Sequence, residues 1–237
     1  MTRLTFTSGF DGYPVWSPDG KAIAIESDRD GVGNLYLIRA EGGAEAQRLT
    51  FSKDPQTPGS FSPDGTRLAF CQRNPDDGTD DIWTIPLTRT ESGELKPGQP
   101  ERFLCTPANE NEPAISPDGH WLAYESDASG TPEIYVRPFP GPGGLWQISS
   151  GGGSVPIWSR SERMLLFKTR DRRIMAAQYT IRGDSFVPDK PRLWCKEQIP
   201  NSRLGRDLTS RQMAGGSRCR CRRRTCRTAK PGTLRYC

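Results

Sequence analysis

A four-residue sequence, Ser-Pro-Asp-Gly, occurs three times at similar intervals, and this repetition constrains the fold more than any other feature of the 237-residue chain. The intact copies begin at Ser17, Ser62 and Ser116, and a degraded fourth copy begins at Ser159. In each intact repeat an arginine lies fourteen residues before this serine, at Arg3, Arg48 and Arg102. Repeats of about forty to fifty residues indicate structural units that stack on one another, as in solenoids and propellers.

The repeated sequence is typical of a tight turn. Proline presets φ, aspartate can accept hydrogen bonds from the backbone that follows it, and glycine adopts the positive φ that other residues resist. Recurrence argues against catalysis, because a catalytic site needs different residues that converge once. We therefore predict structural turn roles for Asp19, Gly20, Asp64, Gly65, Asp118 and Gly119.

Apolar runs around each turn predict four antiparallel strands per repeat. In the first repeat these strands are expected near residues 15–16, 22–25, 34–38 and 47–51. The second strand is apolar at successive residues rather than at alternate ones, which indicates a sheet that is covered on both faces. Four-stranded sheets that stack face to face around an axis meet this requirement, so the fold class predicted is all-β, a β-propeller.

We expect a single propeller domain over residues 1–198, with about four blades and an incomplete ring. The blades are predicted at residues 13–51, 59–105, 113–149 and 156–195. Residues 2–7 resemble the last strand of a further blade that the chain does not complete. Residues 91–98 are predicted to form a lengthened surface loop.

The repeat pattern resembles that of the TolB-like (WD-type) β-propeller family. The pattern is P-x-W-S-P-D-G-x-x-[IL]-A, then S-D-x-x-G, then [NDE]-[IL]-[YW], then R-L-T, carried in the first repeat by residues 14–24, 27–28, 34–36 and 48–50. The resemblance implies four-stranded blades, typically six or more to a ring. Residues 135–141 and 146–149 are further similar to the propellers that lie behind bacterial serine/threonine kinase domains.

No motif of an enzyme accompanies the repeats. The sequence lacks the glycine-rich loop, H-R-D and D-F-G motifs of kinases and the G-x-S-x-G motif of hydrolases. We therefore expect no catalysis and no cofactor, and a scaffold or sensor that binds a protein or peptide at the loop face of the propeller, within a longer kinase-linked signalling chain. The alternative is an accessory propeller that gates substrates for a prolyl-oligopeptidase-like hydrolase.

The C-terminal segment, residues 199–237, has a different composition from the repeats. Residues 201–237 hold 11 of the 33 Lys and Arg residues and only 1 of the 28 acids, so the net charge of +5 conceals an acidic body. We expect this basic Arg/Cys-rich tail to be disordered. It is either an arm that binds nucleic acid or an acidic partner, or an out-of-frame reading, and the second interpretation is favoured because stacking aromatics and a strand pattern are missing.

Four other groups of residues were weighed as sites or as packing residues. Cys219, Cys221 and Cys226 have poor spacing for zinc, and the single histidine, His120, is expected in an exposed turn. The acidic residues Asp76, Asp77, Asp80 and Asp81 are weak calcium candidates whose spacing differs from that of a calcium loop. The recurring tryptophans Trp16, Trp83, Trp121 and Trp158 are predicted to pack between blades.

No apolar run approaches the ~20 residues that span a bilayer, and the first residues lack the apolar core of a signal peptide. The chain as written is therefore expected in the cytoplasm. A piece of a longer exported or membrane-anchored protein would instead lie in the periplasm or outside the cell.

Overall fold

The computed structural model describes residues 4–5, 7–91 and 93–195, which form eighteen strands in four sheets. Blade 1 holds β1 (Asp11–Trp16), β2 (Ala22–Ser27), β3 (Asn34–Arg39) and β4 (Gln47–Arg48). Blade 2 holds β5 (Gln56–Phe61), β6 (Arg67–Arg73), β7 (Asp80–Arg89), β8 (Leu95–Pro97) and β9 (Glu101–Leu104). Blade 3 holds β10 (Glu110–Ile115), β11 (Trp121–Ser126), β12 (Glu133–Pro138) and β13 (Trp146–Gln147). Blade 4 holds β14 (Ser154–Trp158), β15 (Met164–Lys168), β16 (Ile174–Arg182), β17 (Ser185–Pro188) and β18 (Arg192–Cys195).

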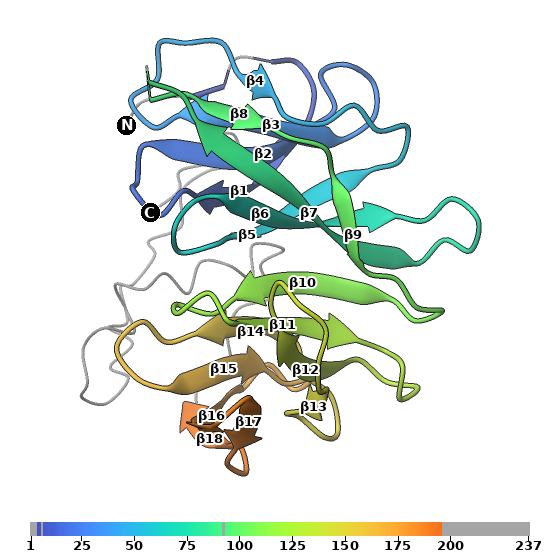
Figure 1. Ribbon diagram of the computed structural model, residues 1–237. Coiled ribbons are helices and arrows are strands. Elements are labelled where there is room, and N and C mark those ends of the chain that lie inside the picture. Colours follow the sequence, from blue (N-terminus) through green and yellow to red (C-terminus); the bar gives the residue numbers. More distant parts are fainter. Residues whose placement is uncertain (1–3, 6, 92, 196–237) are drawn as a thin grey trace, which may run out of the picture.

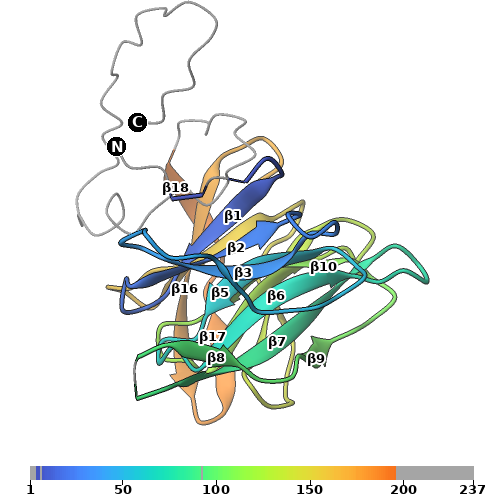
Figure 2. The same ribbon diagram turned by 90° about the horizontal axis from the view of Figure 1, so that it is seen from above.

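The predicted fold class is confirmed, because every sheet consists of antiparallel strands in the order of a propeller blade. Blades 1 and 2 lie in the upper half of Figure 1 and blades 3 and 4 lie side by side in its lower half, and Figure 2 shows the same arrangement from above. The first strands of neighbouring blades are in contact: β1 with β5, β5 with β10, and β10 with β14. We call this succession of four blades the arc.

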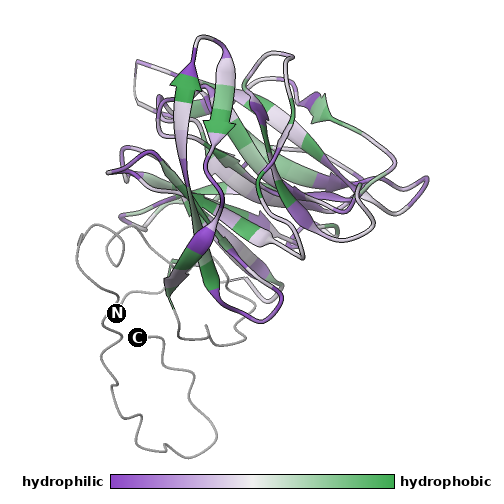
Figure 3. Cartoon of the chain, turned by 90° about the horizontal axis from the view of Figure 1, so that it is seen from below, coloured by the Kyte–Doolittle hydropathy of each residue, from purple (hydrophilic) through white to green (hydrophobic). Residues whose placement is uncertain are grey.

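The hydrophobic core lies between the blades, as stacked sheets require. Between blades 1 and 2 it includes Leu35 and Phe70, between blades 2 and 3 Ile82 and Leu122, and between blades 3 and 4 a larger cluster. Hydrophobic segments accordingly follow the strands, whereas hydrophilic segments gather in the loops (Figure 3). Burial on both sheet faces explains why the second strands are apolar at successive residues.

Two strands were missed by the sequence-based prediction. β8 lies inside the expected loop at residues 91–98, pairs with the end of β7, and buries Leu95. β17 pairs with the end of β16 and places Phe186, which is 1% exposed, among four aromatic rings. These rings belong to Trp121, Trp146, Trp158 and Tyr179. Both hairpins therefore enlarge the core between blades.

The structure places the repeated turn residues in closely similar geometry. Asp19 Oδ1 accepts hydrogen bonds from the Ser17 hydroxyl at 2.6 Å and from the Lys21 backbone N–H at 3.1 Å. Asp64 and Asp118 accept the equivalent bonds in blades 2 and 3. The glycines that follow have positive φ: Gly20 at 70°, Gly65 at 72° and Gly119 at 77°. Each turn joins the first and second strands of its blade.

The first strands begin two or three residues before the predicted starts of their blades at residues 13, 59, 113 and 156; the observed starts are Asp11, Gln56, Glu110 and Ser154. The cause is a β-bulge in each first strand, which the turn pattern does not reveal. In three blades the bulge holds a non-glycine residue at positive φ directly before a proline. These residues are Tyr13 (52°), Glu112 (53°) and Val155 (54°). Such strained conformations are uncommon and gather at functional surfaces.

Three expectations need correction or fall outside the described residues. The strand predicted at residues 2–7 is wrong for Leu4, Thr5 and Thr7, which lie in no strand. A last strand needs the rest of its sheet to pair with. The other residues of this segment, 2, 3 and 6, lie outside the described residues. Trp16 is 57% exposed, whereas its equivalents Phe61, Ile115 and Trp158 are buried against the preceding blade.

The basic tail, with the zinc candidates Cys219, Cys221 and Cys226, also lies outside the described residues, so no structural feature bears on those predictions. Within the described ranges, no helix is long and apolar enough to cross a membrane.

Candidate functional site

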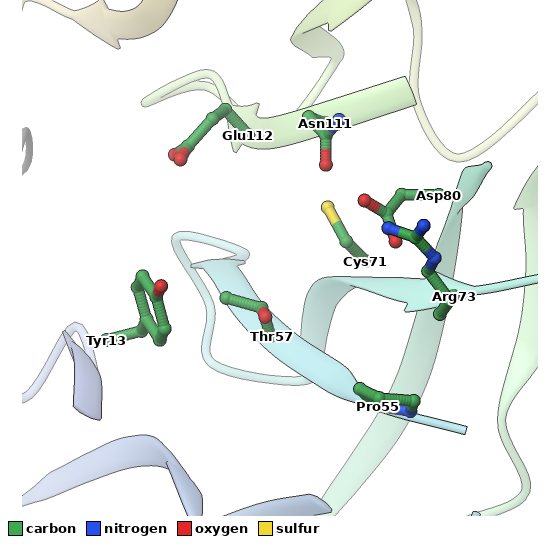
Figure 4. Close-up of a pocket in the computed structure, with 8 residues that line it drawn as sticks. All are labelled: Tyr13, Pro55, Thr57, Cys71, Arg73, Asp80, Asn111 and Glu112. Carbon is green, nitrogen blue, oxygen red and sulfur yellow. The ribbon is translucent and has the colours of Figure 1, made fainter. Parts of the chain in front are cut away.

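The candidate site lies at the end of the arc opposite the repeated turns, where first strands begin and second strands end. We call this the pocketed end. A cavity of about 450 Å³ opens there among blades 1, 2 and 3. We call it the first pocket, and Figure 4 shows its lining. Its lining residues are Tyr13, Pro55, Thr57, Cys71, Arg73, Asp80, Asn111 and Glu112.

An arginine and an aspartate face each other on one wall of the first pocket. Arg73 is the last residue of β6 and Asp80 the first of β7, so the hairpin between these strands brings them together (Figure 4). Burial raises the pKa of the Asp80 carboxyl, and Asp81 adds to this, while the positive charge of Arg73 acts in the opposite direction. The pair gives the pocket both a hydrogen-bond donor and an acceptor of opposite charge.

The opposite walls come from the bulged first strands. Tyr13 of β1 and Glu112 of β10, both at positive φ, line the cavity together with Asn111. Thr57 on the floor donates a hydrogen bond to Glu26 at 2.7 Å. Burial raises the pKa of the Glu26 carboxyl, and the nearby charges of Asp28 and Asp80 raise it further. The first pocket is therefore polar, and its acidic groups outnumber its cationic one.

Two arginines at the pocketed end, Arg73 and Arg170, differ from the residues at the same position in the other two repeats. Blades 1 and 3 carry an aspartate eleven residues after the turn serine, Asp28 and Asp127, where blades 2 and 4 carry Arg73 and Arg170. Asp28 Oδ1 accepts a hydrogen bond from the Phe10 backbone N–H at 2.6 Å, and Asp127 makes the equivalent bond at 2.8 Å. These aspartates fasten the loop before each blade. The arginines cannot accept such a bond, and each lines a pocket instead.

The four calcium candidates do not converge. Asp76 and Asp77 lie in the exposed β6–β7 loop, Asp80 lines the first pocket, and Asp81 is buried with Oδ1 lacking a hydrogen-bond partner. Alternation along β7 sends the last two side chains to opposite faces of the sheet. In the described part of the chain, no group of three or more His, Cys, Asp or Glu residues is arranged to hold a metal ion.

His120 lies in the turn at the other end of the arc, where its backbone N–H donates to Asp118 and its side chain is exposed. It is therefore remote from the first pocket along the strands of its blade. The lining residues Tyr13, Arg73 and Glu112 were not singled out from the sequence. For Arg73 the available signal was an arginine at the repeat position where blades 1 and 3 carry an aspartate.

Comparisons with known proteins agree with this fold. No protein-family model matches the chain. An uncharacterized peptidase, YuxL of Bacillus subtilis, is 27% identical over 156 residues, which cover 52% of this chain and 24% of that protein. The chain spans less than half the length of the curated relatives that it matches.

Solved structures give the same result. TolB from Acinetobacter baumannii aligns with a TM-score of 0.53 and 21% identity over 77% of this chain and 44% of that one. A puromycin-hydrolyzing peptidase of Mycobacterium tuberculosis aligns with a TM-score of 0.53 and 15% identity over 76% and 31%. The chain thus has the fold of a TolB-like β-propeller, and in sequence it is similar to part of one peptidase, YuxL. The finer resemblance to kinase-linked propellers stays a prediction.

Proposed function

We propose that this propeller is the accessory domain of a longer peptidase and that its pocketed end admits peptides to a hydrolase domain. The observation that carries the proposal is the similarity to the peptidase YuxL, because this similarity is one of sequence and not of fold alone. In this role the propeller does no chemistry. It selects substrates by size and charge before they reach the catalytic groups.

The first pocket supports such a role. It lies across three blades, so its walls are rigid, and its volume of about 450 Å³ suits one or two amino-acid side chains. Asp80, Glu112 and nearby Glu26 make it acidic, while Arg73 offers a planar donor to a carbonyl or carboxylate. A peptide could bind with its cationic or amide groups toward the acids.

The coding DNA on both sides of this region provides the first test. A G-x-S-x-G motif in a following strand-turn-helix context supports the proposal. The H-R-D and D-F-G motifs of a kinase would contradict it and would favour the scaffold function within a signalling chain.

Kinetics of the full-length protein provide the second test. Arg73→Gln and Glu112→Gln should raise KM for short chromogenic peptides and leave kcat almost unchanged, because the propeller binds substrate without touching the scissile bond. Arg182→Gln is the matched control, because Arg182 is exposed and lies at the end of β16 that is away from the pocketed end. Unchanged KM in both pocket variants would refute a role of the first pocket in substrate entry.

A further inference from the structure

A second pocket, also of about 450 Å³, lies between blades 3 and 4 at the same end of the arc. Three cationic side chains line it, those of Lys168, Arg170 and Arg172, with Glu125 as the acidic lining residue. Neutral residues complete the lining: Pro132, Gly153, Ser154 and Thr169. The second pocket thus has the opposite charge balance from the first.

The position of Arg170 is built into the fold. Its side chain lies against Gly152, where a Cβ would come within 2.7 Å of Arg170 Cγ, and this glycine has a φ of 107°. The loop of Gly152 is fastened in turn by the Glu133 carboxylate, which accepts the backbone N–H groups of Gly151 at 2.7 Å and Gly152 at 2.8 Å. A glycine is required here both by its conformation and by the close approach of the arginine.

Lys168 and Arg170 keep their charges available to a ligand, although the charge of Lys168 also lowers the pKa of the Glu125 carboxyl. None of the ion pairs among the described residues includes Lys168 or Arg170. Asp171, which follows Arg170, accepts a hydrogen bond from the Thr169 hydroxyl at 2.5 Å and pairs with Arg173 at 2.9 Å. Its carboxylate is therefore already engaged.

We propose that the second pocket binds the C-terminal carboxylate of a peptide. This inference rests on the proposed function, because it names which end of a peptide the propeller holds. An arginine guanidinium donates two parallel hydrogen bonds to a carboxylate, and the lysine ammonium adds a point charge. The volume exceeds the needs of a carboxylate alone, so the neutral walls leave room for the terminal side chain.

Glu125 adjusts the charge of this pocket. Burial raises the pKa of its carboxyl to about 7, and the charges of Glu112 and Asp127 also raise it, whereas Lys168 and the Val155 backbone N–H lower it. The pocket also holds Arg170 and Arg172. Protonation of Glu125 below neutral pH removes the negative charge from the lining, so we expect carboxylate binding to strengthen as the pH falls through 7.

The test compares two ligands of the same sequence on the full chain. N-acetyl-trialanine with a free carboxylate and the same peptide with a C-terminal amide are titrated calorimetrically into the wild-type protein. We expect the acid to bind about tenfold more tightly than the amide, and Arg170→Gln to weaken the acid about tenfold with little effect on the amide. Arg182→Gln on the same blade should leave both affinities unchanged.

The outcomes separate this inference from the proposed function. Equal affinity of the acid and amide peptides would overturn the carboxylate assignment alone, and if inorganic phosphate then binds, the pocket is a phosphate site. Binding of neither peptide would overturn the inference together with the peptide role of the propeller. The comparison on the wild-type chain needs no variant, so misfolding of Arg170→Gln would not prevent a decision.

Discussion

Replacing Glu125 with glutamine should remove a pH-dependent loss of stability from the folded protein. Glu125 lies near the end of β11, largely buried between blades 3 and 4, and its pKa is raised from 4.5 to about 7 mainly by burial. Glutamine has nearly the same shape and can still accept the hydrogen bond of the Val155 backbone N–H. It carries no charge at any pH, so the cost of burying a carboxylate disappears.

The sign and size of the effect follow from the two pKa values. Below pH 4.5 the carboxyl is protonated in the folded and unfolded states, and its ionisation costs nothing. Between pH 4.5 and about 7 the unfolded chain releases the proton while the folded chain retains it, so the free energy of unfolding falls as the pH rises. At 1.36 kcal/mol per pH unit, the total loss above pH 8 is about 3 kcal/mol.

Urea unfolding of the wild type and of Glu125→Gln, measured from pH 4.5 to pH 8.5, checks this prediction. The difference in unfolding free energy between the two proteins should grow by about 3 kcal/mol over this range in favour of the variant. Glu162→Gln, an exposed carboxylate in the fourth turn, is the control and should show a constant difference. Carboxyls that do not interact with Glu125 contribute equally to both proteins and cancel.

A difference that stays constant with pH would refute the reasoning, since it would mean that Glu125 is solvated or neutralised in the folded state. A difference that grows in favour of the wild type would show that Lys168 stabilises the carboxylate by more than burial destabilises it.

Three further predictions concern stability. Gly20→Val should lower the free energy of unfolding by about 1–2 kcal/mol, because Gly20 has a φ of 70° with open space around it, so strain alone acts; an unchanged melting temperature would contradict this. Phe186→Ala should cost about 3–5 kcal/mol in urea unfolding, whereas Leu145→Ala, at an exposed site, should cost almost nothing; equal effects would contradict the role assigned to β17. Trp16→Ser should leave stability nearly unchanged despite its place in the repeat motif, and a large loss would show that its exposed face is covered.

The repeated turns explain how much of the fold was predictable from the sequence. A turn depends on three or four adjacent residues, so Asp19, Gly20 and their equivalents carry their geometry in the local sequence. The strands on either side of each turn were therefore predictable as well. The hairpins formed by β8 and β17 were missed because these strands pair only with extensions of long third strands, and their turns carry a single glycine at positive φ, Gly93 or Gly183, instead of the repeated Ser-Pro-Asp-Gly sequence.

The pockets were less predictable because they depend on how blades meet. Arg73 and Arg170 follow their turns by the same number of residues, yet one pocket is acidic and the other basic. The difference arises from the other lining residues: Glu112 of blade 3 lines the first pocket, whereas Lys168 and Arg172, on the same blade as Arg170, line the second. Only the structure shows which neighbours those are. The aligned position holds an aspartate in blades 1 and 3 and an arginine in blades 2 and 4, and this difference would nevertheless have indicated both arginines.

The exposure of Trp16 makes the first blade optically distinct from the rest of the molecule. Trp121 and Trp158, at 5% and 8% exposure, are shielded inside the stack, whereas Trp16 at 57% and Trp194 at 37% are open to solvent. In a Trp194→Phe background, iodide should therefore quench the fluorescence of Trp16 more strongly than that of the half-buried Trp83 and Trp146 or the buried Trp121 and Trp158. Anything that packs against the open face of blade 1 would protect this emission, so the protein carries its own reporter of what docks there.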